Sequence, residues 1–214
     1  MILQNITSSI VASCWIIFFI YWLVSAFFVK KTVERYKGNL PALLGRLIIA
    51  FAVIVLVSLK DYSIIHFLIS PTGPLSEASL ITGAAITVIG LAIAIWARFT
   101  IGKNWSGQVT FKKDHELITR GPYKFVRHPI YTGLLTMMLG ALLYFGSLLV
   151  LLLFISSAIG FAFKFKQEEK VMIKHFGKRY QDYMKRKIDF ILSIIIAQTL
   201  LTVNIGYQKS DFGS

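Results

Sequence analysis

Long apolar segments dominate this sequence and restrict it to folds that lie within a membrane. Three of them, residues 10–29, 43–59 and 80–99, reach or approach the roughly 20 residues that a helix needs to cross a bilayer. The fourth, residues 130–163, is about twice too long for one span. Residues 144–147 (Tyr-Phe-Gly-Ser) interrupt it near its middle. We therefore predict two helices joined by a tight turn there, and five spans in total.

The predicted fold is an all-α integral membrane protein, because backbone polar groups in lipid must be satisfied within each helix. The chain is 56% hydrophobic and only 15% charged, which is unlike a soluble domain or a disordered chain. Residues 1–9 carry no Lys or Arg, so we expect the first helix to remain as an uncleaved anchor. The single cysteine, Cys14, excludes an intrachain disulfide and a thiolate metal cluster.

The net charge of +13 is concentrated in alternate loops. Residues 30–46, 98–127 and 164–187 are basic, whereas the loop after residue 59 carries little net charge. The positive-inside rule then predicts an external N-terminus and cytoplasmic basic loops. Anionic lipid of the inner leaflet accounts for the cations, so no nucleic-acid partner is expected.

We divide the chain into three regions: a three-span region (1–99), a second region (100–187) and a tail (188–214). The second region contains a polar stretch, the hairpin and a predicted cytoplasmic amphipathic helix over residues 167–187. Alternating residues at 109–111 predict a short extended piece. Residues 188–203 predict an interfacial helix. Small residues in the third span, such as Gly90 and Ala94, predict a gap beside the hairpin through which a lipid-borne ligand could enter.

The motif that carries chemistry is Gly121-Pro122-Tyr123-Lys124-Phe125-Val126-Arg127-His128-Pro129-Ile130-Tyr131-Thr132-Gly133. Ionisable groups at the edge of an apolar segment indicate a functional site, although a basic anchor reaching lipid headgroups is an alternative. Pro129 can begin a helix, and the unpaired N–H groups of residues 130–132 would attract an anion beside Arg127 and His128. Gly133 and Gly140 share one helical face and predict a glycine-lined slot.

The predicted hairpin brings a second element to this motif. If the turn centres on Gly146, Lys124 and Glu168 lie level, so Glu168 and Glu169 return close to Arg127 and His128. One interpretation is an interfacial salt bridge of little energetic value. The other is a site for a ligand that carries both a carboxylate and an ammonium or sulfonium group.

Taken together, these motifs resemble the isoprenylcysteine carboxyl methyltransferase family. The resemblance covers about Trp96 to Lys187 and rests on three further elements: Gly102-x-Asn104-Trp105-Ser106-Gly107, Glu168-Glu169, and Phe176-Gly177-x-x-Tyr180-x-x-Tyr183. It implies an integral membrane enzyme of the bacterial or archaeal type, in the inner (plasma) membrane, with a cytoplasmic pocket for S-adenosylmethionine. The implied acceptor is a lipidated, isoprenylcysteine-like carboxylate or another lipophilic molecule.

Matching the family motifs residue by residue implies a cofactor-binding set of Tyr123, His128, Pro129, Tyr131, Gly133, Glu168 and Glu169. The implied catalytic set is Arg127, Glu168 and Arg179. No metal site is expected, because the four histidines are scattered. Three alternatives remain: a phospholipid N-methyltransferase, an NADPH-dependent enzyme similar to sterol reductases, and a non-enzymatic scaffold that binds anionic lipid.

Overall fold

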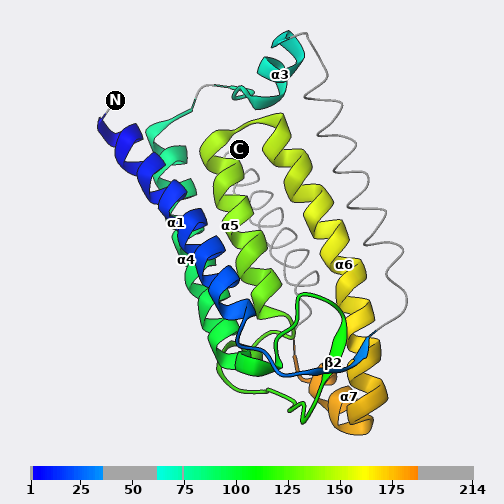
Figure 1. Ribbon diagram of the computed structural model, residues 1–214. Coiled ribbons are helices and arrows are strands. Elements are labelled where there is room, and N and C mark those ends of the chain that lie inside the picture. Colours follow the sequence, from blue (N-terminus) through cyan, green and yellow to red (C-terminus); the bar gives the residue numbers. More distant parts are fainter. Residues whose placement is uncertain (1, 36–61, 74, 188–214) are drawn as a thin grey trace, which may run out of the picture.

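The computed structural model describes residues 2–35, 62–73 and 75–187 (Figure 1). Its helices are α1 (Ile2–Ala26), α3 (Tyr62–Ile69), α4 (Glu77–Ile101), α5 (Pro129–Phe145), α6 (Leu148–Phe176) and α7 (Lys178–Lys185), with short 3-10 helices η1 (Gly102–Asn104) and η2 (Gly121–Lys124). Two short strands, β1 (Thr32–Arg35) and β2 (Thr110–Lys112), complete it.

The helices confirm the predicted all-α membrane fold. Among the described residues, three helices are long and apolar enough to span a membrane: Ile2–Ala26, Glu77–Asn104 and Leu148–Phe176. Helix α5 is apolar but shorter. Figure 1 shows that the two strands and α7 lie at one end of the bundle, whereas α3 and the α5–α6 turn lie at the other. The predicted span 43–59 and the predicted interfacial helix 188–203 lie outside the described residues.

Helix α1 begins earlier than the predicted boundary at residue 10. Its first turns are polar, but their hydroxyls are satisfied by the helix backbone: Thr7 Oγ1 donates to Leu3 O at 2.9 Å, and Ser9 Oγ donates to Asn5 O at 2.9 Å. Such back-bonding lets Ser and Thr remain within a helix. The apolar boundary and the helical boundary therefore differ at this end.

Glycines hold α4 and α5 in direct backbone contact. A Cβ on Gly133 would lie 2.5 Å from Ala94 N and 2.7 Å from Gly90 O. A Cβ on Gly83 would lie 2.8 Å from Gly140 O. Small residues allow this approach where no hydrophobic force drives helices together. The predicted glycine-lined slot is thus wrong, because α4 fills it. The predicted gap beside Gly90 and Ala94 is wrong for the same reason.

The hairpin prediction is confirmed. Helix α5 ends at Phe145, Gly146 adopts the left-handed conformation (φ 58°), and α6 begins at Leu148. Ser147 caps α6, since its side chain accepts a hydrogen bond from Val150 N. Glycine suits this turn because a positive φ costs it nothing sterically.

A buried arginine joins the ends of α1 and α4. Arg98 is 3% exposed, and its guanidinium donates to Ser25 O at 2.6 Å and to Gly102 O at 2.8 Å. It also lies 4.6 Å above the centre of the Trp105 ring. Carbonyls at a helix C-terminus lack helical partners, and a cation there is favourable. Arg98 therefore fixes where the chain leaves both spans.

Strand β2 overlaps the extended piece predicted at 109–111, and its partner β1 was not predicted. The strands are antiparallel, with Thr32 opposite Lys112. Glu34 on β1 contacts Lys174 Nζ at 2.6 Å and His175 Nε2 at 3.0 Å. The two-stranded sheet is therefore attached to the end of α6.

Residues 167–187 do not form the single amphipathic helix that was predicted. Helix α6 continues without a break to Phe176, since residues 164–176 contain no Pro or Gly to end it. Gly177 then adopts a positive φ of 53° and separates α6 from α7. The chain turns there, which brings the buried Tyr180 and Tyr183 of α7 back towards η2.

Replacing Gly133 by Ala should destabilise the fold, because the added methyl group would meet the backbone of α4. Overpacking of this kind typically costs about 1–3 kcal/mol. The matched control is Gly160→Ala in α6, where an added Cβ has no heavy atom within 4 Å. That change should stabilise the helix by up to about 1 kcal/mol. Thermal unfolding in detergent, followed by circular dichroism, measures both. Equal midpoints for the two variants would contradict the close α4–α5 packing.

Candidate functional site

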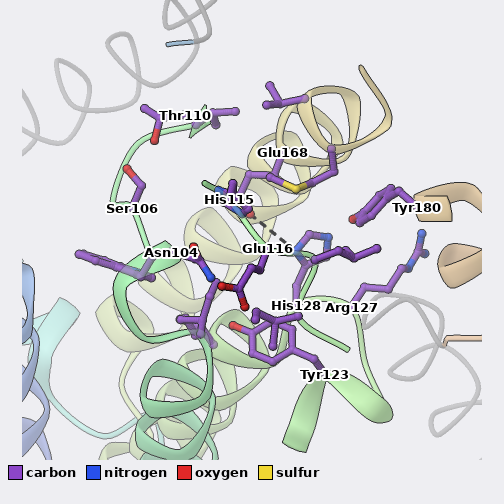
Figure 2. A pocket seen from close by; sticks show the side chains of 18 of the residues that line it. Asn104, Ser106, Thr110, His115, Glu116, Tyr123, Arg127, His128, Glu168 and Tyr180 are labelled. Atoms are coloured by element: carbon purple, nitrogen blue, oxygen red, sulfur yellow. Dashed lines mark ion pairs between the residues drawn. The ribbon is translucent and has the colours of Figure 1, made fainter. Parts of the chain in front are cut away.

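A cavity lies at the polar end of the bundle, where several elements meet (Figure 2). The loop from η1 to β2 lines it on one side, and η2 with the start of α5 lines another. The C-terminal part of α6 and helix α7 complete it. The lining is mixed: polar and ionisable groups lie next to apolar side chains such as Ile130, Val171 and Met172.

Ionic contacts join α6 to the residues around the start of α5. Arg127 Nη1 lies 2.8 Å from Glu169 Oε1. His128 contacts both acids, with Nε2 at 3.3 Å from Glu169 Oε1 and Nδ1 at 3.7 Å from Glu168 Oε2. The Tyr131 hydroxyl donates to Glu168 Oε1 at 2.6 Å. We call these five residues the ionic wall.

The ionic wall is largely removed from water. The side chains of Arg127, His128 and Glu169 are between 7% and 15% exposed, and that of Glu168 is 23% exposed. Breaking such a buried pair by removing one partner typically costs about 3–5 kcal/mol, because it leaves an uncompensated charge. The contacts therefore fix the end of α6 against the start of α5 as well as shaping the cavity.

Pro129 begins α5 as predicted, with His128 as the preceding cap residue. The expectation of three unpaired N–H groups is wrong for Thr132, whose N–H donates to His128 O at 3.0 Å. The Thr132 hydroxyl donates to the same oxygen at 3.1 Å. Side chains of the ionic wall, rather than the helix N-terminus, supply most of the polar groups here.

Aromatic stacking holds the ionic wall in place. The His128 ring is parallel to Phe165, with centroids 4.5 Å apart and an interplanar angle of 8°. Tyr131 packs between Phe161 and Phe165, at 4.9 and 5.0 Å. Lys164 Nζ lies 5.2 Å from the centre of the Tyr131 ring. Rings fixed in this way keep the polar atoms of His128 and Tyr131 directed at the acids.

Three tyrosines close the cavity on the side of α7. The Tyr183 hydroxyl donates to Tyr123 O at 2.7 Å, which attaches α7 to η2. Burial, followed by the charge of Glu168, raises the pKa of Tyr123 well above 10. Burial raises the pKa of Tyr183 to about 12 and also raises that of Tyr180. All three phenols are therefore neutral at pH 7 and able to donate hydrogen bonds.

The structure brings most of the predicted site residues together. Tyr123, Arg127, His128, Tyr131 and Glu168 line the cavity. Four others are not among its described lining residues. Pro129 begins α5, Gly133 packs on α4, Glu169 contacts Arg127 and His128, and Arg179 is exposed on α7. The cofactor-binding and catalytic roles of these residues stay predictions. The described residues contain no cluster that could hold a metal ion.

One side of the cavity was not predicted from the sequence. Asn104, Ser106, Thr110, His115 and Glu116 line it from the connection between α4 and η2 (Figure 2). No periodic pattern marks this stretch. The one available signal was the motif Gly102-x-Asn104-Trp105-Ser106-Gly107, which supported the family resemblance but received no functional assignment.

His115 belongs to an aromatic cluster beside the cavity. Its ring stacks on Phe111 at 4.9 Å, and Phe111 stacks on His175 at 3.6 Å. Lys112 N donates to His115 Nδ1 at 3.3 Å, which favours a neutral imidazole. Burial, together with the nearby charge of Lys30, lowers the pKa of His115 from 6.5 to about 4.

Folding stability should therefore depend on His115 as pH falls. The folded state disfavours the protonated ring, so its contribution is complete above pH 6.5 and is lost progressively towards pH 4. Between pH 6.5 and 5, wild type should lose more stability than His115→Gln. Stability measured at lower pH is less informative about His115. The hydrogen bond from Lys174 lowers the pKa of Glu34, so protonation of Glu34 also reduces stability there. Imidazole NMR signals measure the titration directly, and a His115 midpoint near 6.5 would refute the assignment.

The region that contains this site is similar to known membrane methyltransferases. The family model described as phospholipid methyltransferase matches residues 78–179. Protein-S-isoprenylcysteine O-methyltransferase of Dictyostelium discoideum is 34% identical over 113 residues, covering 48% of this chain and 45% of that protein. The Schizosaccharomyces pombe protein of the same name is 36% identical over 90 residues, covering 40% and 37%. The chain thus spans less than half the length of these two relatives.

A solved structure shares the fold. The eukaryotic intramembrane Ras methyltransferase ICMT superposes with a TM-score of 0.51 at 22% identity, covering 66% of this chain and 51% of that one. Residues 78–179, the region matched by the family model, contain the motif around Arg127 and His128, the hairpin and the acidic pair. Over the matched regions, the chain is similar to the phospholipid methyltransferase family model and to proteins named protein-S-isoprenylcysteine O-methyltransferase.

Proposed function

We propose that this protein uses S-adenosylmethionine to methylate a carboxylate of a lipophilic, isoprenylcysteine-like acceptor. The observation that carries the proposal is the ionic wall, in which Arg127, His128 and Tyr131 meet Glu168 and Glu169 at a cavity next to the membrane spans. Named relatives that methylate isoprenylcysteine support it.

The chemistry of the lining fits this cofactor. S-adenosylmethionine carries a carboxylate, an ammonium, a sulfonium and two ribose hydroxyls. Arg127 and His128 would hold the carboxylate, since charge-assisted hydrogen bonds to guanidinium and imidazole are among the strongest available. Glu168 would accept hydrogen bonds from the ammonium group or from the ribose hydroxyls of the cofactor. The cavity thus offers groups of both signs to a ligand that carries both signs.

The protein has mainly to align the reactants. When bound, S-adenosylmethionine supplies a methyl group attached to a positively charged sulfur. The sulfur is the leaving group and becomes a neutral thioether. A carboxylate acceptor is already ionised at pH 7, so it needs no general base. The rigid ionic wall orients the ligands, and the buried Tyr123, Tyr180 and Tyr183 limit access of water.

The lipid tail of the acceptor favours access from the bilayer. Each methylene that stays in the hydrocarbon region is stabilised by about 0.8 kcal/mol, so a prenyl or acyl chain would remain there during the reaction. The cavity has apolar lining residues at the start of α5 and on α6, namely Ile130, Val171 and Met172. These can contact the tail close to the reacting carboxylate.

Phospholipid methylation is the second candidate, and the description of the matching family model favours it. One assay separates the two. Protein in nanodiscs is incubated with methyl-labelled S-adenosylmethionine and either a prenylcysteine or a phosphatidylethanolamine. A carboxyl methyl ester releases labelled methanol in alkali, whereas an N-methylated lipid retains its label. Base-stable label on the lipid amine alone would overturn the carboxylate assignment.

Cofactor binding should depend on the acidic pair. Glu168→Gln keeps the shape of the side chain but removes the negative charge of the group that accepts a hydrogen bond from Tyr131. S-adenosylmethionine binding should weaken by about 1–3 kcal/mol, or roughly 5- to 150-fold in Kd. Glu77→Gln, an exposed acid in the first turn of α4 at the opposite end, is the matched control. Isothermal titration calorimetry measures both, and equal affinities would defeat the assignment of Glu168.

A further inference from the structure

Two polar atoms in the cavity are buried without a hydrogen-bond partner. They are Asn104 Oδ1 and Thr110 Oγ1, and each of these residues is 7% exposed. Both residues line the cavity. A buried polar atom left unmatched typically costs about 1–3 kcal/mol. Two such atoms at one cavity indicate that their partners come from a bound ligand.

Local structure directs both residues into the cavity. Gly102 has a positive φ of 54°, which turns the chain out of α4 and into η1, where Asn104 is the last residue. Thr110 begins β2 and is held opposite Arg35 of β1 by the strand pairing. The backbone that carries both side chains is therefore held by η1 at one end of the loop and by the strand pairing at the other.

This side of the cavity differs chemically from the ionic wall. Asn104, Ser106, Gln108 and Thr110 are neutral and can both donate and accept hydrogen bonds. The buried Val109 lies among them in the sequence and also lines the cavity. Figure 2 shows Asn104, Ser106 and Thr110 towards one side of the view, and Arg127 and Tyr180 towards the other. We call residues 104–110 the neutral wall.

We propose that the neutral wall binds the adenine base of the cofactor, with Asn104 contacting the amino edge and Thr110 a second polar atom of the ring. The inference rests on the proposed function. A carboxamide matches adenine because it can accept from the N6 amino group and donate to N7, a pairing that proteins use to recognise this base. Val109 and Ile118 offer apolar contacts to the faces of the ring.

The unpaired oxygen of Asn104 also argues that the carboxylate of the methyl-accepting substrate does not bind at the neutral wall. Asn104 Oδ1 needs a donor, and an ionised carboxylate has none to offer. A carboxylate is better matched by the guanidinium of Arg127. The two walls therefore bind opposite ends of one cofactor. The charged amino-acid end lies at the ionic wall, and the neutral base lies at the neutral wall.

The test compares two ligands that differ only in the base. S-adenosylhomocysteine carries the N6 amino group, and S-inosylhomocysteine carries an oxygen in its place. By calorimetry in detergent, wild type should bind the inosyl ligand about 10- to 100-fold more weakly. Asn104→Leu should weaken S-adenosylhomocysteine binding by a similar factor and should no longer distinguish the two ligands.

Thr110→Val should weaken S-adenosylhomocysteine binding but should still distinguish the two bases. Thr136→Val is the matched control, because its hydroxyl bonds Thr132 O within α5 and does not line the cavity. It should bind both ligands as wild type does. The thermal midpoint of each ligand-free variant establishes that it is folded, and the comparison of ligands on wild type needs no variant at all.

The outcomes separate this inference from the proposed function. If wild type binds neither ligand, the proposed function itself is wrong. If wild type binds both ligands equally, the adenine assignment is wrong and the proposed function stands. If Asn104→Leu retains cofactor affinity and instead raises the KM for the prenylated acceptor, the neutral wall belongs to the acceptor site and the inference is overturned.

Discussion

The candidate site depends on the tight turn at Gly146, which returns the chain to the membrane boundary. A positive φ at Gly146 and a side-chain cap from Ser147 let α6 start directly after α5 ends. The two helices then run back antiparallel, and the acids at positions 168 and 169 arrive beside Arg127, His128 and Tyr131 (Figure 1). A longer or looser connection would allow α6 to slide along α5 and would separate these groups.

Closure of the hairpin and formation of the ionic wall stabilise each other. A carboxyl group at the edge of an apolar segment is costly unless it is paired, and each acid here has a partner near the start of α5. Arg127 and His128 in turn contact an acid that only the returning helix can supply. Stacking of His128 on Phe165 adds an apolar contact between the same two segments. The polar groups are therefore fixed before any ligand arrives.

Much of this arrangement could be predicted from the sequence. The length of the apolar block and its interruption at Tyr144–Ser147 predicted the hairpin, and counting from Gly146 placed Glu168 near the motif. The register was less accurate. Counting set Glu168 level with Lys124, whereas its hydrogen-bond partner is Tyr131, because residues 121–128 do not continue the path of α5. A count along the chain cannot include such a change of direction.

Glycine was the residue type that sequence reasoning interpreted least well. Gly133 and Gly140 share a face, and such a face can admit either a ligand or another helix. The backbone of α4 occupies it here, and the glycines of α4 face those of α5. One sequence read alone identifies a face that permits close approach but does not identify what approaches. The end of α6 posed a similar problem, since a change from apolar to polar residues marks a membrane boundary and not a helix end.

The neutral wall was missed for a different physical reason. Helices reveal their faces through periodic side chains, but residues 104–110 are positioned by contacts from elsewhere: Arg98 holds Gly102 O, Lys164 Nζ donates to Gly107 O at 2.8 Å, and β1 pairs with β2. Two of these contacts come from distant parts of the chain, α6 and β1, and the third comes from the end of the adjacent helix α4. The ionic wall is therefore encoded largely within the motif and its hairpin, whereas the neutral wall is positioned only when β1, α4 and α6 have packed around it.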